Sequence, residues 1–320
     1  MGKIKVGVIG VGYLGVFHAR KYSEIENVEL VGIVDVDKDR ADNSAEELGC
    51  RSFQDYNEMF PLVDAVSIVV PTSYHHKVAS DCIEAGKDIL LEKPMTVTLE
   101  EADDLIAKAE KNDAILQVGH LEQFNPAIVA MKPSLKRPMF IESNRIHIYK
   151  NRAVDVDVVL DLMIHDIDII LSIIDSPIKT IHTVGAPVVT KTTDIANARI
   201  IFENGATANV TVSRISKTNI RKMRIFQPGS YITVDFANRK VMTIHLKKEL
   251  MESGMPKQDI EIKEFSHGDA LKSEIEHFVY NVENRTRPTV SGIEGRRALE
   301  VALQVIEQIR EYQEVLSYDS

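Results

Sequence analysis

The stretch VIGVGYLG, residues Val8–Gly15, decides the architecture of the first part of the chain. Its GxGxxG pattern follows a run typical of a buried strand, Lys5–Ile9, and opens a run typical of a helix, Tyr13–Ser23. GxGxxG alone is a weak signal, but a strand before it and a helix after it form the context of a dinucleotide-binding turn. The sequence therefore predicts a Rossmann βαβ unit here.

Each residue of this turn has an expected role in cofactor binding. Gly10 makes the tight turn, Gly12 lets the backbone approach a pyrophosphate, and Gly15 lets the helix pack on the strand. Tyr13 and Leu14 begin the helix, whose N-terminal N–H groups and positive potential suit phosphates.

An acidic residue stands at the position expected for ribose recognition. Asp35 lies twenty residues after Gly15, at the end of the second predicted strand. A carboxylate there accepts hydrogen bonds from the adenosine ribose and repels a 2′-phosphate, so we expect NAD rather than NADP. Asp37 could share this role. The alternative, a glycine-rich turn followed by an ordinary loop aspartate, is disfavoured because context, spacing and acid agree.

Strand and helix patterns alternate over the first 120 or so residues, which predicts a parallel sheet. Gly86 is a suitable C-terminal cap, and Thr98 with Glu101 forms a predicted capping box. The further strands are expected at Val28–Val34, Val63–Val70, Asp88–Leu91 and Ala114–Val118, and the helices at Lys38–Leu48, His76–Ala85 and Leu99–Asn112.

After Phe124 longer strands predominate, and Glu203-Asn204-Gly205 predicts a hairpin turn. We expect an α/β protein: a Rossmann dinucleotide-binding domain over residues 1–122, and an α+β substrate-binding and oligomerisation domain with an open, mostly antiparallel sheet over 123–320. Strands are expected at Phe140–Tyr149, Ile181–Val189, Ala196–Phe202, Thr207–Arg214, Met223–Phe226, Tyr231–Phe236 and Lys240–Leu246, and helices at Asp157–Asp175, Asp269–Asn284 and Gly292–Leu316.

Composition excludes several classes of protein. The 320 residues are 44% hydrophobic, which is enough for two cores. A net charge of -10 argues against general nucleic-acid binding, and no apolar run reaches the ~18 residues of a membrane span. The two cysteines, Cys50 and Cys82, lack a metal-like spacing, and no signal-peptide pattern is present. We therefore expect a cytoplasmic protein with free thiols, no metal, and no membrane or nucleic-acid partner.

Two further strand ends should face the cofactor, because ligands of doubly wound sheets bind beyond the carboxyl ends of the strands. Pro71 and Thr72 close one strand, and His75 and His76 follow. Either one of these histidines touches the ribose or nicotinamide side, or both lie in solvent as helix-entry residues. Glu92 and Lys93 end the apolar run DILL, and a lysine beside a cofactor can polarise an oxygen.

The segment DVDVVLDLMIHDIDIILSIID, residues 155–175, is apolar nearly all round, which predicts a buried helix. Asp161 and His165 stand at i and i+4, so a carboxylate can orient an imidazole as a general base. A hydrogen-bonded polar stripe at a domain interface is equally open. The polar exceptions fall within an arc of roughly 80° at helical pitch and are Asp157, Asp161, His165, Asp168 and Ser172.

These motifs, in this order and over essentially the whole chain, resemble the Gfo/Idh/MocA oxidoreductases. The resemblance implies NAD(P)-dependent oxidation or reduction of a sugar, cyclitol or related hydroxyl, with Lys93, Asp161 and His165 as the catalytic residues. The spacing of Pro71 and His75 also looks family-like.

A narrower resemblance concerns VGHLEQFNPA, Val118–Ala127, and VDVVLDLMIHDIDI, Val156–Ile169. Both look like the branch that oxidises UDP-N-acetylglucosamine at the 3-hydroxyl, a step that begins the synthesis of an amide-linked lipid A in some bacteria. Gln123 departs from the arginine often found in that branch.

Two locally basic stretches, Ser143–Arg152 and Arg214–Arg224, contain no acid and could bind a diphosphate. A solvated strand face or a subunit contact is the favoured alternative for them. The candidate substrate-binding residues are Asn125, Arg145, Lys150, Arg152 and Arg214.

The sequence thus favours an NAD-dependent dehydrogenase of a nucleotide sugar. Its rivals are a dehydrogenase of a free sugar or inositol and a non-catalytic NAD-binding sensor. An uncovered face of the second sheet would favour a homodimer or homotetramer.

Overall fold

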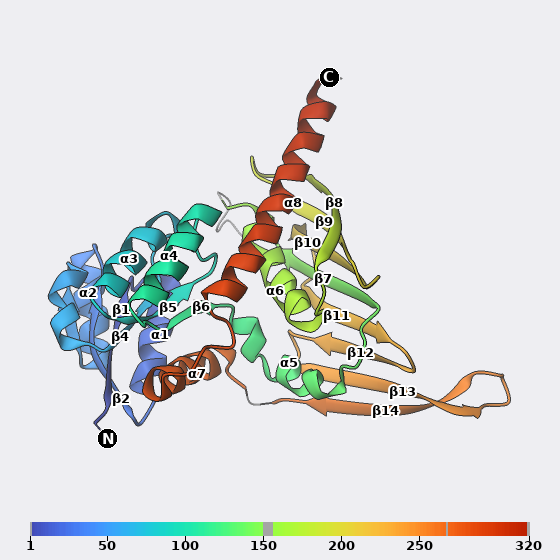
Figure 1. Cartoon of the computed structure of the whole chain (residues 1–320), viewed down its shortest axis with the longest axis horizontal. Helices are drawn as coiled ribbons and strands as arrows, with labels where there is room; N and C mark the ends of the chain where they lie inside the picture. Colours follow the sequence, from blue (N-terminus) through green and yellow to red (C-terminus); the bar gives the residue numbers. More distant parts are fainter. Residues whose placement is uncertain (1, 150–155, 267, 319–320) are drawn as a thin grey trace. The chain divides into compact units, whose positions relative to one another are not determined.

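The computed structural model of the chain describes residues 2–149, 156–266 and 268–318, and it divides into two compact units (Figure 1). The first unit holds the described residues up to Leu121 together with Asp269–Leu299, and the second holds those of Glu122–Gly268 and from Glu300 onward. The first crossing lies within a residue of the expected division at 122/123. Residues 269–299 return to the first unit, which the expected division placed in the second.

The first unit contains, in its described residues, a sheet of six parallel strands in the order β3-β2-β1-β4-β5-β6. The order reverses between β1 and β4, as in dinucleotide-binding folds, so the predicted Rossmann architecture is confirmed. The strands are β1 (Ile4–Ile9), β2 (Val28–Val34), β3 (Arg51–Phe53), β4 (Ala65–Ile68), β5 (Asp88–Glu92) and β6 (Leu116–Gly119).

Helices connect these strands, and their ends follow local chemistry. At the start of α4, Thr98 Oγ1 accepts a hydrogen bond from Glu101 N–H and the Glu101 carboxylate accepts one from Thr98 N–H, which confirms the predicted capping box. Gly86, after α3, has a φ of +71°. The helices are α1 (Tyr13–Ser23), α2 (Lys38–Leu48), α3 (His75–Glu84), α4 (Leu99–Lys111), α7 (Ala270–Asn284) and the beginning of α8 (Gly292–Tyr318).

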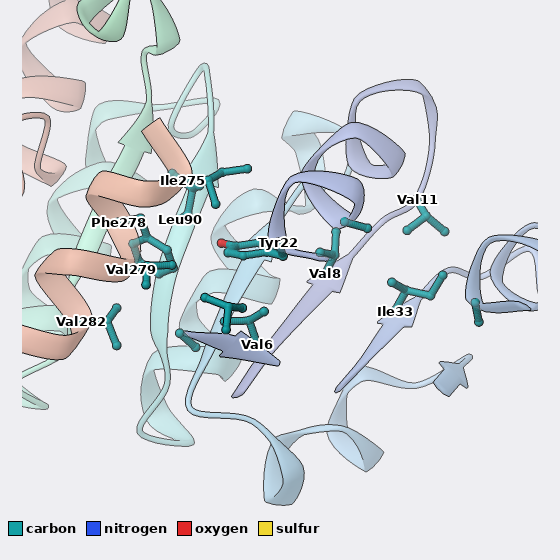
Figure 2. Packing of buried hydrophobic residues seen from close by; sticks show 14 residues of the cluster. Val6, Val8, Val11, Tyr22, Ile33, Leu90, Ile275, Phe278, Val279 and Val282 are labelled. Carbon is teal, nitrogen blue, oxygen red and sulfur yellow. The ribbon is translucent and has the colours of Figure 1, made fainter. Parts of the chain in front are cut away.

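The core of the first unit explains why α7 belongs to it (Figure 2). Phe278 and three aliphatic residues of α7 join a buried cluster that includes Val6 and Val8 of β1, Tyr22 of α1 and Leu90 of β5. Burying an aromatic ring and several aliphatic side chains stabilises the unit by roughly 1.5–3 kcal/mol for each large side chain.

The second unit contains, in its described part, an eight-stranded sheet in the order β14-β13-β12-β11-β7-β10-β9-β8. β7 and β10 run parallel and the other described pairs are antiparallel, so the predicted mostly antiparallel sheet is confirmed. The strands are β7 (Phe140–Ile148), β8 (Ile178–Ala186), β9 (Ile195–Phe202), β10 (Thr207–Ser216), β11 (Ile220–Gln227), β12 (Ser230–Asp235), β13 (Lys240–Leu250) and β14 (Pro256–Glu264).

Local sequence explains one turn of this sheet and one strand that the sequence did not predict. Gly205 has a φ of +85° and makes the predicted hairpin between β9 and β10. β14, with the sequence PKQDIEIKE, was not predicted, because it is almost wholly exposed and so rich in charge that it lacks a clear strand pattern.

The expected helix Asp157–Asp175 divides in two. Val159–Met163 (η6) is a π-helix, in which Val159 O accepts from Ile164 N–H five residues on, and α6 (Ile164–Ile173) follows. α5 (Pro126–Met131) precedes the sheet. The distal part of α8 packs on β8, where a Cβ on Gly185 would lie 2.8 Å from Ile309 Cδ1.

Two composition-based expectations meet the structure here. Cys50 and Cys82 are free thiols, as expected. Within the described ranges, the helices are all too short or too polar to cross a membrane.

Candidate active site

The glycine turn has the geometry that a pyrophosphate needs. Gly10 has a φ of +88° and its N–H donates to Val34 O at 2.7 Å. A Cβ on Gly15 would lie 1.8 Å from Gly10 O, so the helix and the turn pack too closely for any side chain. A Cβ on Gly12 would meet no described atom within 4 Å. Gly12 therefore leaves open space at the helix N-terminus, where a phosphate is expected to bind.

A hollow of about 560 Å³ lies against this turn. Tyr13 and Phe17 form part of its wall, with their rings edge to face at 5.4 Å between centroids, and Leu14 beside them is 39% exposed. The hollow is lined by Val11, Gly12, Tyr13, Val16, Phe17 and Arg40. Exposed apolar side chains next to phosphate-binding N–H groups suit a nucleotide, which carries an apolar base and charged phosphates.

Asp35 holds the glycine turn, and its contact with a ribose stays a prediction. Its Oδ2 accepts from Val11 N–H at 3.0 Å and its Oδ1 from Asp37 N–H at 3.0 Å, and the residue is only 7% exposed. Asp37 instead caps α2 by accepting from Arg40 N–H at 3.1 Å. The geometry thus separates the two acids: Asp35 is fixed under the turn, and Asp37 belongs to the helix start.

Arg40 is a residue of this site that sequence reasoning missed. Its Nη1 lies 3.3 Å from Asp35 Oδ2 and its Nη2 lies 3.1 Å from Asp37 Oδ2. The signal was present as Asp35-x-Asp37-x-x-Arg40, since the third residue after a helix cap faces back toward that cap. Arg40, which lines the hollow, offsets part of the negative charge of the two carboxylates.

The end of β4 is tied to the turn after β5 by His75. Its Nδ1 lies 2.9 Å from Pro94 O and its Nε2 lies 2.9 Å from Val70 O, and the side chain is buried. Burial lowers the pKa of His75, so the neutral ring donates to one carbonyl at a time. Pro71 and Thr72 lie in the chain between Val70 and His75, which are joined by one of these contacts. The contacts support a holding role for His75, and its direct contact with the cofactor stays a prediction.

Lys93 begins the turn after β5. The side chain is half-buried, and its backbone N–H donates to Glu92 Oε2 at 3.1 Å. Glu92 itself is 6% exposed, so its carboxylate lies beneath the turn rather than on the surface.

In the second unit, the predicted polar stripe separates into two sets. Asp161 lies in the π-helix and His165 at the beginning of α6, and both are half-buried. Asp168 is buried and accepts from Gln123 Nε2 at 2.7 Å, and Asp157 caps the segment through Val159 N–H. π-helical turns are frequent at functional sites, and Asp161 lies in one. The catalytic roles of Asp161 and His165 stay a prediction.

The basic residues expected to meet a diphosphate have acidic partners from elsewhere in the chain. Arg145 donates from Nε and Nη2 to Asp166 at 2.9 and 3.1 Å and from Nη1 to Glu122 at 3.0 Å, all buried. Arg221 donates to the same Glu122 oxygen. These contacts support a structural role for Arg145, and diphosphate binding by it stays a prediction that the geometry does not favour.

Two other residues predicted to bind the substrate, Arg214 and Asn125, also have hydrogen-bond partners within the protein. Arg214 Nη2 donates to Val156 O, and Arg214 Nε lies 3.8 Å from Asp194 Oδ1. Asn125 is the N-cap of α5, where its Oδ1 accepts from Ala127 N–H at 3.1 Å. Lys150 and Arg152 lie outside the described residues.

A doubly wound sheet with a glycine turn after β1 and a fixed acid after β2 defines a dinucleotide-dependent protein. Residues 4–120 match the oxidoreductase family with an NAD-binding Rossmann fold, and residues 134–227 match the Gfo/Idh/MocA C-terminal domain. The chain belongs to the Gfo/Idh/MocA oxidoreductase family, and NAD is its cofactor.

The chain is similar to sugar and inositol dehydrogenases. UDP-N-acetylglucosamine 3-dehydrogenase of Acidithiobacillus ferrooxidans is 39% identical over 303 residues, 94% of this chain and 96% of that protein. Myo-inositol 2-dehydrogenase of Thermotoga maritima is 26% identical over 92% of this chain and 93% of its own. A solved structure of the Acidithiobacillus enzyme superposes with a TM-score of 0.90 at 37% identity, covering 98% of this chain and 99% of that one.

Proposed function

We propose that the protein oxidises the 3-hydroxyl of UDP-N-acetylglucosamine to a ketone with NAD. The observation that carries this proposal is 39% identity, over nearly the full length of both chains, to an enzyme named for that reaction. The inositol dehydrogenase, at 26% identity over a similar length, makes a free polyol the alternative substrate.

The first unit supplies the cofactor site. The N–H groups at the start of α1 bind the pyrophosphate beside Gly12, and Asp35 accepts hydrogen bonds from the ribose. Bound NAD supplies the hydride acceptor. Val11 N–H and Asp37 N–H hold the Asp35 carboxylate in place, so the proposed ribose acceptor has a fixed orientation.

Three residues carry the proton chemistry in this proposal. His165 takes the proton from the sugar hydroxyl as general base. Asp161, four residues earlier, orients the imidazole and stabilises its charged form. The Lys93 ammonium donates a hydrogen bond to the same oxygen and stabilises the negative charge that develops on it. His165 and Asp161 belong to the second unit and Lys93 to the first.

Assembly and location follow from the same proposal. The hairpin of β13 and β14 exposes large apolar side chains, and apolar surface of this kind favours association of copies into a homodimer or homotetramer. Those residues are Leu246, Leu250, Met251, Met255, Ile260 and Ile262. With a UDP-sugar as substrate, the enzyme would work in the cytoplasm, at the start of amide-linked lipid A synthesis.

Turnover of a small substrate panel tests the proposal. Purified protein with NAD would receive UDP-N-acetylglucosamine, N-acetylglucosamine or myo-inositol, together with a carbonyl trap that removes the ketone, and NADH absorbance would be followed. We expect NADH only with the UDP-sugar. NADH formation with myo-inositol alone would make a free polyol the substrate. No NADH with any of the three compounds, while NAD still binds, would favour a non-catalytic NAD-binding sensor.

A further inference from the structure

A buried polar network lies beneath the turn that carries Lys93. His18, on the buried face of α1, has no exposed surface. Its Nε2 lies 3.1 Å from Glu92 Oε1, and its Nδ1 lies 3.2 Å from Ser67 Oγ of β4. Ser67 Oγ in turn lies 2.8 Å from the hydroxyl of Tyr22, whose ring is part of the core cluster in Figure 2. Side chains from three elements thus form one chain of contacts that ends at Glu92.

Every polar side chain of this network has a partner within it. His18 Nε2 contacts the Glu92 carboxylate, His18 Nδ1 contacts the Ser67 hydroxyl, and the Tyr22 hydroxyl donates to Ser67. Burial raises the pKa of Tyr22, which keeps it a phenol and therefore a donor. Burial therefore leaves none of these groups without a partner.

Glu92, which His18 holds through one carboxylate oxygen, also contacts the backbone of Lys93. Its second oxygen, Oε2, accepts the backbone N–H of Lys93 at 3.1 Å. Gly119, the partner of Glu92 across β5 and β6, leaves room for the carboxylate, since a Cβ there would lie 3.1 Å from Glu92 Cδ. Burial alone would raise the pKa of Glu92, but the hydrogen bond from His18 and the positive charges of His18 and Lys93 lower it overall. The side chain is therefore an anion held directly below the lysine.

We propose that His18 is a positioning residue for Lys93 and acts through Glu92. His18 fixes one oxygen of the carboxylate, the other oxygen fixes the start of the Lys93 turn, and the fixed negative charge favours the ammonium form of Lys93. Because His18 lies on α1, whose first turn is the phosphate-binding end, the same helix serves both the cofactor and the lysine. The inference rests on the proposed function only in giving Lys93 its catalytic role.

The charged groups around Glu92 define what a titration would report. Lys93 follows it directly, His18 faces it from α1, and His75 faces it from α3. Glu274 of α7 faces the far end of the network, at Tyr22. Substitutions at His18 and Glu92 leave His75 and Glu274 in place, so the comparison among variants isolates the Glu92 charge.

Three variants test the positioning role through turnover. His18→Leu should lower kcat by about 10- to 100-fold, since small misplacement of a catalytic group has this effect, while the KM for NAD changes by less than about threefold. His18→Gln, whose amide can still donate to Glu92, should recover kcat to within about threefold of the parent. The double variant His18→Leu/Glu92→Gln should be no slower than Glu92→Gln alone, because His18 acts through Glu92.

Two turnover results would overturn the proposal. One is a His18→Leu enzyme with parental kcat, and the other is a double variant slower than Glu92→Gln by the full factor that His18→Leu costs alone. His18→Gln guards against misfolding, because it keeps a partner for the buried Glu92.

A second measurement does not depend on the substrate. The pH dependence of trace acetylation of Lys93 by acetic anhydride, read by peptide mass spectrometry against exposed Lys3, reports the ammonium directly. Glu92→Gln should move the Lys93 titration to lower pH by about one unit, with Lys3 unchanged. If the Lys93 titration in Glu92→Gln stayed where it is in the parent, the claim that the Glu92 charge favours the Lys93 ammonium would be refuted. If no sugar were oxidised by the parent enzyme, the proposed function would fail, and this measurement, made on His18→Leu as well as on Glu92→Gln, would still test whether His18 and Glu92 act on Lys93.

Discussion

The glycine turn after β1 and the buried cluster of Arg145, Asp166 and Glu122 both contain charged or polar groups, but these groups are directed in opposite ways. At the turn, Gly12 leaves open space at the N-terminus of α1, and Asp35 accepts hydrogen bonds from two backbone N–H groups. In the cluster, Arg145 is enclosed between Asp166 and Glu122, with side chains 3%, 1% and 2% exposed.

The difference separates a ligand site from a structural one. A ligand site keeps donors and acceptors directed at a space that another molecule can enter, whereas a structural cluster directs them at one another. By this criterion the open space beside Gly12 is the candidate NAD site, and the contacts of Arg145 support a structural role in the second unit. The predictions below test that separation.

The largest expected effect is on catalysis. Lys93→Ala and His165→Ala should each lower kcat by about 10³-fold or more, because one removes the stabilisation of a developing oxyanion and the other removes the base. NAD affinity, measured by calorimetric titration, should stay within about threefold. Parental turnover in either variant would remove that residue from the mechanism.

Removal of Arg145 should affect folding more than ligand binding. Arg145→Met leaves Asp166 and Glu122 buried with one fewer cation, so we expect a loss of about 3–5 kcal/mol in the free energy of unfolding, measured with urea. The matched control is Arg224→Met on β11, whose partner Glu142 is exposed, with an expected loss of about 0–1 kcal/mol. An Arg145 variant of parental stability that loses UDP-sugar affinity would make the cluster a ligand site after all.

Alanine substitutions at two glycines of the same turn should affect different properties of the protein. Gly12→Ala adds a methyl group into open space, so the protein should keep its unfolding temperature while NAD affinity falls by about 100-fold or more. Gly15→Ala places the methyl group 1.8 Å from Gly10 O, so the unfolding temperature itself should fall. Thermal unfolding and NAD titration of both variants provide the check. NAD binding unchanged in Gly12→Ala would mean that the open space is not the phosphate approach.

A smaller effect is expected from a structural acid in the second unit. Burial alone would raise the pKa of Asp194, but N–H donors from Val188, Val189 and Thr190 lower it to about 2. Because the folded pKa lies below the unfolded value of 3.8, Asp194 contributes stability above about pH 4, and this is lost as pH falls through 2.

Asp194→Asn should therefore cost about 2 kcal/mol at neutral pH, and the difference from the parent should shrink between pH 4 and pH 2. Urea unfolding at a series of pH values measures it, with exposed Asp259→Asn as control. A difference that stays constant down to pH 2 would contradict this account of Asp194.

The first unit could be predicted from sequence because its determinants are local. The glycine turn, Asp35 and the capping box of Thr98 and Glu101 each lie within one or two adjacent elements, where spacing alone fixes geometry. Arg40 was within reach of the same reasoning, since it stands three residues after the cap Asp37.

Other features could not be predicted, because the residues that form them are distant in sequence. A stretch without acids around Arg145 looked basic, yet Glu122 and Asp166 lie 23 and 21 residues away and neutralise it. The network of His18, Ser67 and Glu92 likewise joins three separate elements. The π-helix at Val159–Met163 and the return of α7 to the first unit depend on tertiary packing, which no local pattern encodes.

The central claim is that hydride leaves carbon 3 of UDP-N-acetylglucosamine for NAD. The most direct test is turnover of UDP-N-acetylglucosamine deuterated at carbon 3, with a carbonyl trap, followed by mass spectrometry of the reduced cofactor. The account predicts one deuterium in the reduced nicotinamide and slower turnover than with the unlabelled sugar. Reduced cofactor without deuterium, formed at the unlabelled rate, would contradict it.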